Sequence, residues 1–378
     1  MSEKMRGELE TARIRGKRTW LAVILAFLGI TGAFIFLHLN SPNVEERLAT
    51  INADRAIPDS QNAAVIYNLL LEDPNVASLG YLPEFIDVNS DGQTLLQPWL
   101  EKDYPEVAAW IEEYRWLIDK LIEASHFEKC HFPLVADWYD STRSTQLSIV
   151  RRWAFLIKRA SNNDIAENRN EDAIAKCKCL IRMGEHFRQQ SMLIEYLNGI
   201  AIESLGLNQM IVLIMEGNID ESHLQEIELI LMRTRNNWVT AMDRIEHVEE
   251  LVQWKFKEQL GLIGRLKYKL RYGLFGKKRK YKEVRFISNR ILTSKRGIHI
   301  LMALKRYKNK YSKWPKDLDE IKSMVVEHIL VDPLSSRSFV YKLTNDGFIL
   351  YSKGKNNLDE GGRKKDGADD WPIWLPRQ

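Results

Sequence analysis

Cysteine is scarce in this sequence of 378 residues, which contains three: Cys130, Cys177 and Cys179. Three cysteines are too few for a framework of disulfide bonds. Cys177 and Cys179 stand two positions apart in a predicted helix and therefore point in different directions, which suits buried apolar residues better than shared metal ligands. Net charge is also small, at +4. The overall charge therefore gives no reason to expect a nucleic-acid-binding protein.

Recognisable catalytic motifs are missing as well. The sequence contains no P-loop, no Gly-x-Ser-x-Gly motif and no glycine fingerprint for a dinucleotide. Glu185 and His186 could form an acid–base pair in a predicted helix, but no nucleophile accompanies them. His126, Cys130 and His131 include one pair at i, i+4 spacing, but they stand near a predicted helix end and no fourth metal ligand is apparent. An enzyme with its site among His126, His131, Glu185 and His186 is therefore the alternative to a non-catalytic protein.

An apolar run of twenty residues, from Trp20 to Leu39, carries no Asp, Glu, Lys or Arg. As a helix it is just long enough to span a hydrocarbon core of roughly 30 Å. Four basic residues precede the run between positions 13 and 18, and glutamates follow it at 45 and 46. By the positive-inside rule the N-terminus is cytoplasmic, and everything after Asn40 lies in the periplasm of a cell with an inner membrane. A cleaved signal peptide is the alternative, but no Ala-x-Ala site closes the run.

Residues 60–260 show the apolar spacing of successive amphipathic helices. The helix expected over 192–215 contains Glu195, Asn198 and Glu203, which are costly in lipid, so we expect a core helix and not a second membrane span. Short polar connections, one of them at 161–164, predict an irregular α-helical domain built from helical hairpins. The clearest helices are expected over residues 62–71, 104–125, 144–160, 171–189 and 192–215.

A strongly basic stretch occupies residues 261–289. Ten Lys or Arg and a single Glu lie between positions 265 and 285, interleaved with aromatic residues. We interpret this stretch as a solvated linker between two domains. Binding of anionic lipid or of an acidic partner, through residues such as Arg279 and Lys280, is an alternative. Nucleic acid is a weaker alternative, because the stretch lies on the exported side of the membrane.

From residue 290 the pattern changes to that of a small α+β unit. A helix is predicted over 290–309, and two runs of alternating polarity follow at 339–343 and 348–351. The sequence Asn-Asp-Gly at 345–347, between the two runs, is a strong signal for a β-hairpin. A loop rich in Gly, Asn and Asp comes after the second run. The unit is therefore predicted to be one helix packed on a small antiparallel sheet.

Five short motifs follow one another in this predicted unit. They are Tyr311-Ser312-Lys313-Trp314-Pro315, Asp332-Pro333, Leu350-Tyr351-Ser352-x-Gly354, Glu360-Gly361-Gly362 and Ala368-Asp369-Asp370. Their order resembles the globular domain of the major pseudopilin of type II secretion systems, the protein G family. The resemblance covers residues 290–374 and implies a helix, a hairpin and a glycine-rich closing loop.

In that family the closing loop binds calcium, and the resemblance implies four ligands here. They are the carbonyl of Lys353, the side chain of Asn356, and the carboxylates of Asp369 and Asp370. Ligands made only of oxygen suit Ca²⁺. Asn356 stands where the family has Asp, and nearby lysines add repulsion, so the predicted site is weakened. The alternative is a loop closed by Asp and Asn side chains that bind its own backbone amides.

The N-terminal apolar run departs from the pilin pattern. It lacks the Glu that follows a prepilin-peptidase site, and about 250 residues separate it from the C-terminal unit. Polymerisation through the N-terminal helix, as in pilins, is therefore not expected.

The sequence thus predicts a mainly α, single-pass membrane protein that is non-catalytic. It would act as a structural or interaction component linked to secretion or envelope assembly, with envelope proteins as partners. The predicted segments are a cytoplasmic tail at 1–18, a transmembrane helix at 19–39, a linker at 40–59, a helical domain at 60–260, a basic linker at 261–289 and a pseudopilin-G-like domain at 290–378.

Overall fold

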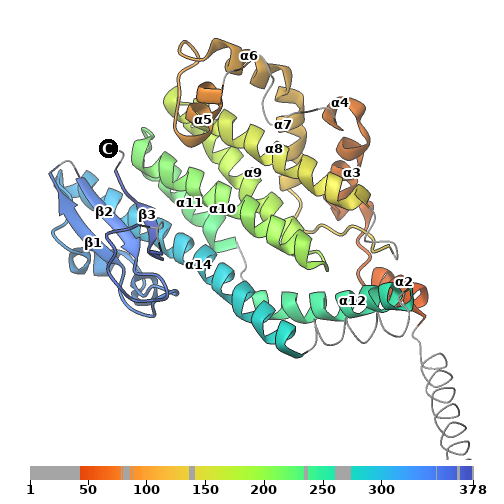
Figure 1. Cartoon of the computed structure of the whole chain (residues 1–378). Helices are drawn as coiled ribbons and strands as arrows, with labels where there is room; N and C mark the ends of the chain where they lie inside the picture. The colour runs from red at the N-terminus through yellow and green to blue at the C-terminus, as the bar shows by residue number, and fades with distance from the viewer. Residues whose placement is uncertain are drawn as a thin grey trace, which may run out of the picture.

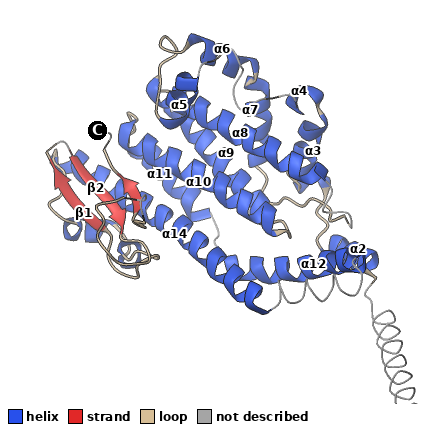
Figure 2. Cartoon of the chain, viewed as in Figure 1, coloured by secondary structure: helices blue, strands red, loops and turns tan. Residues whose placement is uncertain are grey.

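The computed structural model describes residues 43–77, 79, 86, 88–135, 141–233, 237–259, 274–345, 347–363 and 367–376. The predicted transmembrane helix at 19–39 lies outside these residues, as do positions 261–273 of the basic stretch. The described chain is mainly helical and contains one small antiparallel sheet, as predicted. Figure 2 shows the strands at one edge of the helical body.

The helices form a body in which those over residues 141–166, 170–188 and 193–216 lie side by side (Figure 1). In chain order they are α2 (Val44–Asp54), the 3₁₀ turn η1 (Asp59–Gln61), α3 (Ala64–Glu72), α4 (Pro74–Ala77), α5 (Val88–Leu96), α6 (Pro105–Glu113), α7 (Arg115–Ser125), α8 (Ser141–Ala166), α9 (Asn170–Arg188), α10 (Leu193–Glu216), α11 (Glu221–Arg233), α12 (Trp238–Gln259) and α14 (Leu274–Tyr311), followed by the 3₁₀ helices η2 (Leu318–Met324) and η3 (Glu327–Leu330).

The helices predicted over 171–189 and 192–215 are confirmed as α9 and α10. The break predicted at 161–164 is wrong, because α8 continues through it to Ala166. Asn162 is buried there and donates to the carbonyls of Thr94 (2.9 Å) and Leu95 (3.1 Å), at the end of α5. Polar residues that resemble a turn in the sequence therefore serve as buried donors inside a helix.

Helices α9 and α10 approach each other closely through glycines. A Cβ atom at Gly184 would lie 2.6 Å from the backbone nitrogen of Glu203, and one at Gly199 would lie 2.5 Å from the carbonyl oxygen of Gly184. Among the described helices, α10 is the one that is long and apolar enough to cross a membrane, but 61% of its most apolar window is buried inside the protein. This burial agrees with the prediction of a core helix.

The predicted linker at 40–59 contains helix α2. Asn43 caps the helix by accepting a hydrogen bond from the amide of Glu46. Val44 and Leu48, four residues apart, are both buried in a small apolar cluster to which α12 also contributes. Figure 1 shows α2 beside α12.

The basic linker predicted at 261–289 is helical in its described part, and the boundary predicted at 290 falls inside α14. Helix α14 carries apolar residues such as Ile291 and Ile298 into one core that also contains residues of α10 and of the sheet. Periodicity did not reveal this arrangement, because charged residues interrupt the apolar spacing before 290. The side chains of 274–280, which include Arg279 and Lys280 of the alternative lipid contact, lie outside the described residues.

The sheet contains β1 (Val340–Thr344), β2 (Gly347–Ser352) and β3 (Trp371–Trp374) in the order β1-β2-β3. The predicted hairpin is confirmed, with Thr344 opposite Gly347. Strand β3 was not predicted, because it is short and contains Pro372. Proline is tolerated there since β3 is an edge strand, which among the described residues pairs with β2 alone.

Candidate functional site

The Gly/Asp loop runs from the end of β2 to the start of β3, and its own carboxylates close it. Asp369 Oδ2 accepts from the amides of Lys355 (3.1 Å) and Asn356 (3.2 Å). Asp370 Oδ2 accepts from the amides of Glu360 (3.0 Å) and Gly362 (2.8 Å). These hydrogen bonds match the alternative prediction, in which the loop binds its own backbone.

A glycine is required where the two ends of the loop meet. Gly354 has a φ of +62°, and a Cβ atom there would lie 2.2 Å from both the carbonyl oxygen and Oδ1 of Asp369. Any larger residue would be strained and would also push Asp369 away. The short motif that ends in Gly354 thus has a steric reason in this chain.

The structure brings Asp369 to the backbone of Asn356 but leaves only some of the predicted ligand oxygens available. Asn356 Oδ1 accepts from the amide of Leu358 at 2.7 Å. In contrast, Asp369 Oδ1 and Asp370 Oδ1 are buried with no hydrogen-bond partner in the described part of the chain. Burial raises the pKa of Asp370 above its usual value. Two buried carboxylate oxygens without a partner are what a bound cation would satisfy.

Calcium here would also need backbone carbonyls, such as the predicted one of Lys353. Over the described residues, no group of three His, Cys, Asp or Glu side chains is placed to hold a metal ion. Glu360, for which the sequence predicted no role, bonds to the other end of the loop. Its Oε2 accepts from the amides of Asp369 (2.7 Å) and Asp370 (3.3 Å). Its position in the Glu-Gly-Gly motif was the available signal.

His186, a candidate acid or base, is buried and makes hydrogen bonds with two neighbouring residues. Its Nε2 lies 2.9 Å from the carbonyl oxygen of Phe127 and therefore donates to it, and its Nδ1 accepts from the Tyr67 hydroxyl at 2.9 Å. Burial lowers the pKa of His186 to about 4, so the ring is neutral at neutral pH. The neighbouring Glu185 pairs with Arg182 and lines a cavity. Glu185 and His186 therefore do not form an acid–base pair.

His126 and His131 do not join the other candidates. His126 is exposed, whereas His131 is buried and its pKa is lowered to about 4, first by burial and then by Arg55. Cys130 is buried, and burial raises the pKa of its thiol well above the usual value. Over the described residues, His126, Cys130 and His131 are not among side chains grouped so that they could hold a metal ion.

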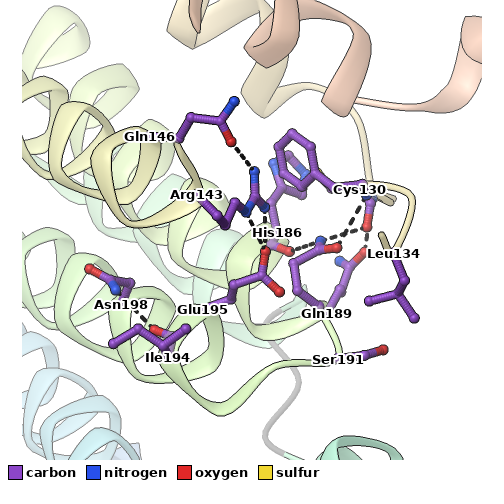
Figure 3. A network of polar contacts seen from close by, with 12 residues as sticks. Cys130, Leu134, Arg143, Gln146, His186, Gln189, Ser191, Ile194, Glu195 and Asn198 are labelled. Carbon is purple, nitrogen blue, oxygen red and sulfur yellow. Dashed lines mark hydrogen bonds and ion pairs between the residues drawn. The ribbon is translucent and has the colours of Figure 1, made fainter. Parts of the chain in front are cut away.

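The extended segment 128–134 is held in place by side-chain amides. Asn52, Asn62, Gln189 and Gln190 form eight hydrogen bonds with its backbone, at 2.8–3.2 Å. Figure 3 shows part of this network beside the ion pair between Arg143 and Glu195. The polar residues of this region therefore satisfy buried backbone groups.

No known family model, curated protein or solved structure matches the chain. The likeness to the protein G pseudopilins rests on the ordered motifs in the sequence.

Proposed function

We propose that this chain is a membrane-anchored, non-catalytic interaction protein with a pseudopilin-G-like C-terminal unit, which serves protein secretion or envelope assembly. Residues 20–39 would anchor it in the inner membrane, with the N-terminus cytoplasmic and the remainder periplasmic. The observation that carries the proposal is the ordered motif set together with its arrangement in space. Helix α14, the hairpin of β1 and β2, and a glycine-rich loop closed by Asp369 and Asp370 follow one another along the chain, as the resemblance leads one to expect.

The placement of the candidate catalytic residues supports the non-catalytic part of the proposal. His186 is neutral and engaged by Tyr67 and Phe127, while Glu185 is paired with Arg182. General acid–base catalysis needs groups that converge on one substrate atom. An interaction protein needs instead a rigid surface, which the shared core of α10, α14 and the sheet can supply.

A cysteine placed on the closing loop tests both location and interaction. The three native cysteines are 0–1% exposed, whereas Leu358 is 61% exposed, so the Leu358→Cys thiol is the accessible one. We expect a membrane-impermeant maleimide that carries a benzophenone to label this variant in spheroplasts. Illumination should then crosslink it to an envelope or secretion protein, which mass spectrometry identifies.

Val135→Cys is the matched control, since Val135 is also apolar and 56% exposed but lies outside the C-terminal unit. Labelling of Leu358→Cys only after cell lysis would contradict the periplasmic location. Labelling without any crosslinked envelope protein, or an identical set of crosslinks from both variants, would contradict the proposed role of the C-terminal unit.

We further propose that the closing loop binds calcium weakly, through the carbonyl of Lys353, Asn356, Asp369 and Asp370. The two buried oxygens without a partner support this assignment. Bound calcium would crosslink the two ends of the loop and would add no chemistry beyond structural stability. Asn356 would contribute less than a carboxylate, because it carries no charge.

The calcium proposal predicts that Asn356→Asp strengthens the response to the metal. The experiment uses the full chain, because a cut at residue 290 would split α14 and its core. Millimolar calcium should raise the midpoint of thermal unfolding, and more so for Asn356→Asp, since a ligand at a hundred times its Kd stabilises by about 2.7 kcal/mol. Magnesium at equal concentration is the control. An unchanged midpoint in both proteins would remove the calcium assignment.

A further inference from the structure

A half-open cavity of about 570 Å³ lies between α9, α10, α11, α12 and the segment that precedes Cys130. Its volume is in the range of roughly 300–1,000 Å³ that small-molecule sites occupy. Two of its lining residues are acidic, Glu128 and Glu185. Five lining residues are basic, namely Lys129, Arg182, Arg188, Arg233 and Arg244. The lining therefore has an excess of three positive charges.

Part of this positive charge is neutralised within the protein, and part is not. Arg182 pairs with Glu185 at 2.7 Å, and Arg188 pairs with Glu203. Lys129, Arg233 and Arg244 have no carboxylate partner within the described ranges, although each lines the cavity. Cations gathered in one concavity focus a positive potential on its interior.

Arg244 is held in place by carbonyl oxygens, which orient it without neutralising it. Its Nη2 donates to the carbonyls of Arg188 (2.9 Å) and Gln190 (3.1 Å), and its Nε donates to Gln190 (3.3 Å). These carbonyls lie at the C-terminal end of α9, where the helix dipole favours a cation. Nη1 makes no hydrogen bond to any described residue. Burial, and then repulsion from Arg55, lowers the pKa of Arg244 to about 10, so it stays charged at neutral pH.

Two exposed apolar side chains lie in this region. Met232 is 67% exposed on α11, and Leu229 is 56% exposed beside an adjoining cavity of about 190 Å³. The two cavities share Arg182, Glu185 and Arg233. A ligand with both an anionic group and an apolar part would therefore find partners in this region.

We propose that this cavity binds a small organic phosphate through Arg244, Arg233 and Lys129. Guanidinium groups match the oxygens of phosphate in geometry, and the excess of three positive charges suits a multiply charged group better than a single carboxylate. A soluble phosphate ester and the headgroup of an anionic lipid share this chemistry. Met232 and Leu229 would contact the organic part of either ligand.

Calorimetric titration of the full chain in detergent tests this assignment. The probes are inorganic pyrophosphate, dihexanoyl phosphatidic acid and citrate, each at constant ionic strength. We expect pyrophosphate to bind, and Arg233→Gln to weaken binding about tenfold or more, because charge-assisted contacts to phosphate are strong. Arg233 is exposed and forms no ion pair with a described residue, so this variant should remain folded. Tighter binding of the phosphatidic acid would assign the phosphate to a lipid headgroup.

Arg285→Gln is the matched control, because Arg285 is an exposed arginine on α14 that does not line the cavity. Its affinity for pyrophosphate should equal that of the native chain. The proposal is overturned if pyrophosphate does not bind, if citrate binds and phosphates do not, or if both variants lose affinity equally. The last result would mean that general surface charge binds the anion.

Discussion

Glu203→Ala is expected to reduce the free energy of unfolding by about 3–5 kcal/mol, the cost of removing one partner from a buried ion pair. Glu203 is fully buried on α10 and pairs with Arg188 of α9 and with Lys295 of α14, whose Nζ lies 2.7 Å from Oε1. Burial alone would raise the pKa of Glu203, but Lys295 and Arg188 outweigh it and hold that pKa below its usual value. Without the carboxylate, two buried cations repel each other.

Urea denaturation followed by tryptophan fluorescence measures this loss. The matched control is Glu112→Ala, which removes an ion pair with Arg115 in which both side chains are more than 60% exposed. That variant should keep the native midpoint, because water screens the pair. If Glu203→Ala were as stable as the control, the three helices would not depend on this carboxylate. Glu203→Ala combined with Lys295→Met should recover part of the loss, since it removes one of the unpaired cations.

The same ion pairs explain why the sequence predicted α10 correctly as a core helix. Glu195 and Glu203 were judged too costly for lipid, and both are buried with basic partners, Arg143 and Arg188. Apolar spacing of 3.6 residues set the extent of α9 and α10 to within about two residues at each end. These features are local, so a single sequence carries them.

Non-local partners decided the features that the sequence did not predict. The residues at 161–164 resemble a turn, yet Asn162 is helical because the end of α5, nearly seventy positions earlier, supplies its acceptors. The domain boundary predicted at 290 falls inside helix α14, whose residues on both sides of 290 belong to one core. Such contacts depend on tertiary packing, which overrides local patterns.

The two candidate sites differ in the same way. The closing loop is contiguous, so the motif that ends in Gly354 marked its start at the end of β2, and the motif that contains Asp369 and Asp370 marked its end. The basic cavity was missed, because Lys129, Arg233 and Arg244 come from three separate segments and stand in no motif. Only the tertiary arrangement of the segment before Cys130, α11 and α12 brings these charges to one cavity.

Asp332→Ala is expected to cost about 3–5 kcal/mol, since it removes four hydrogen bonds to a buried carboxylate. Oδ1 accepts from the hydroxyl of Thr293 on α14 and from the amide of Leu334, both at 3.0 Å. Oδ2 accepts from the amide of Ser335 (3.0 Å) and from the hydroxyl of Ser352 on β2 (2.6 Å). Asp332 therefore joins the helix, the turn and the sheet, which gives the Asp-Pro motif a physical reason.

Limited proteolysis and urea denaturation together should detect this loss, with cleavage appearing first in the loop that follows Ser352. Asp317→Ala is the control, because Asp317 is exposed and accepts one hydrogen bond, from the amide of Asp319. Asp332→Asn separates the charge from the hydrogen bonds. The Asn side chain keeps one acceptor oxygen, but an NH₂ group that replaces Oδ2 faces two donors. We therefore expect a loss of stability between that of the native chain and that of Asp332→Ala. Native stability of Asp332→Asn would mean that neither the charge nor the second oxygen holds β2 against α14.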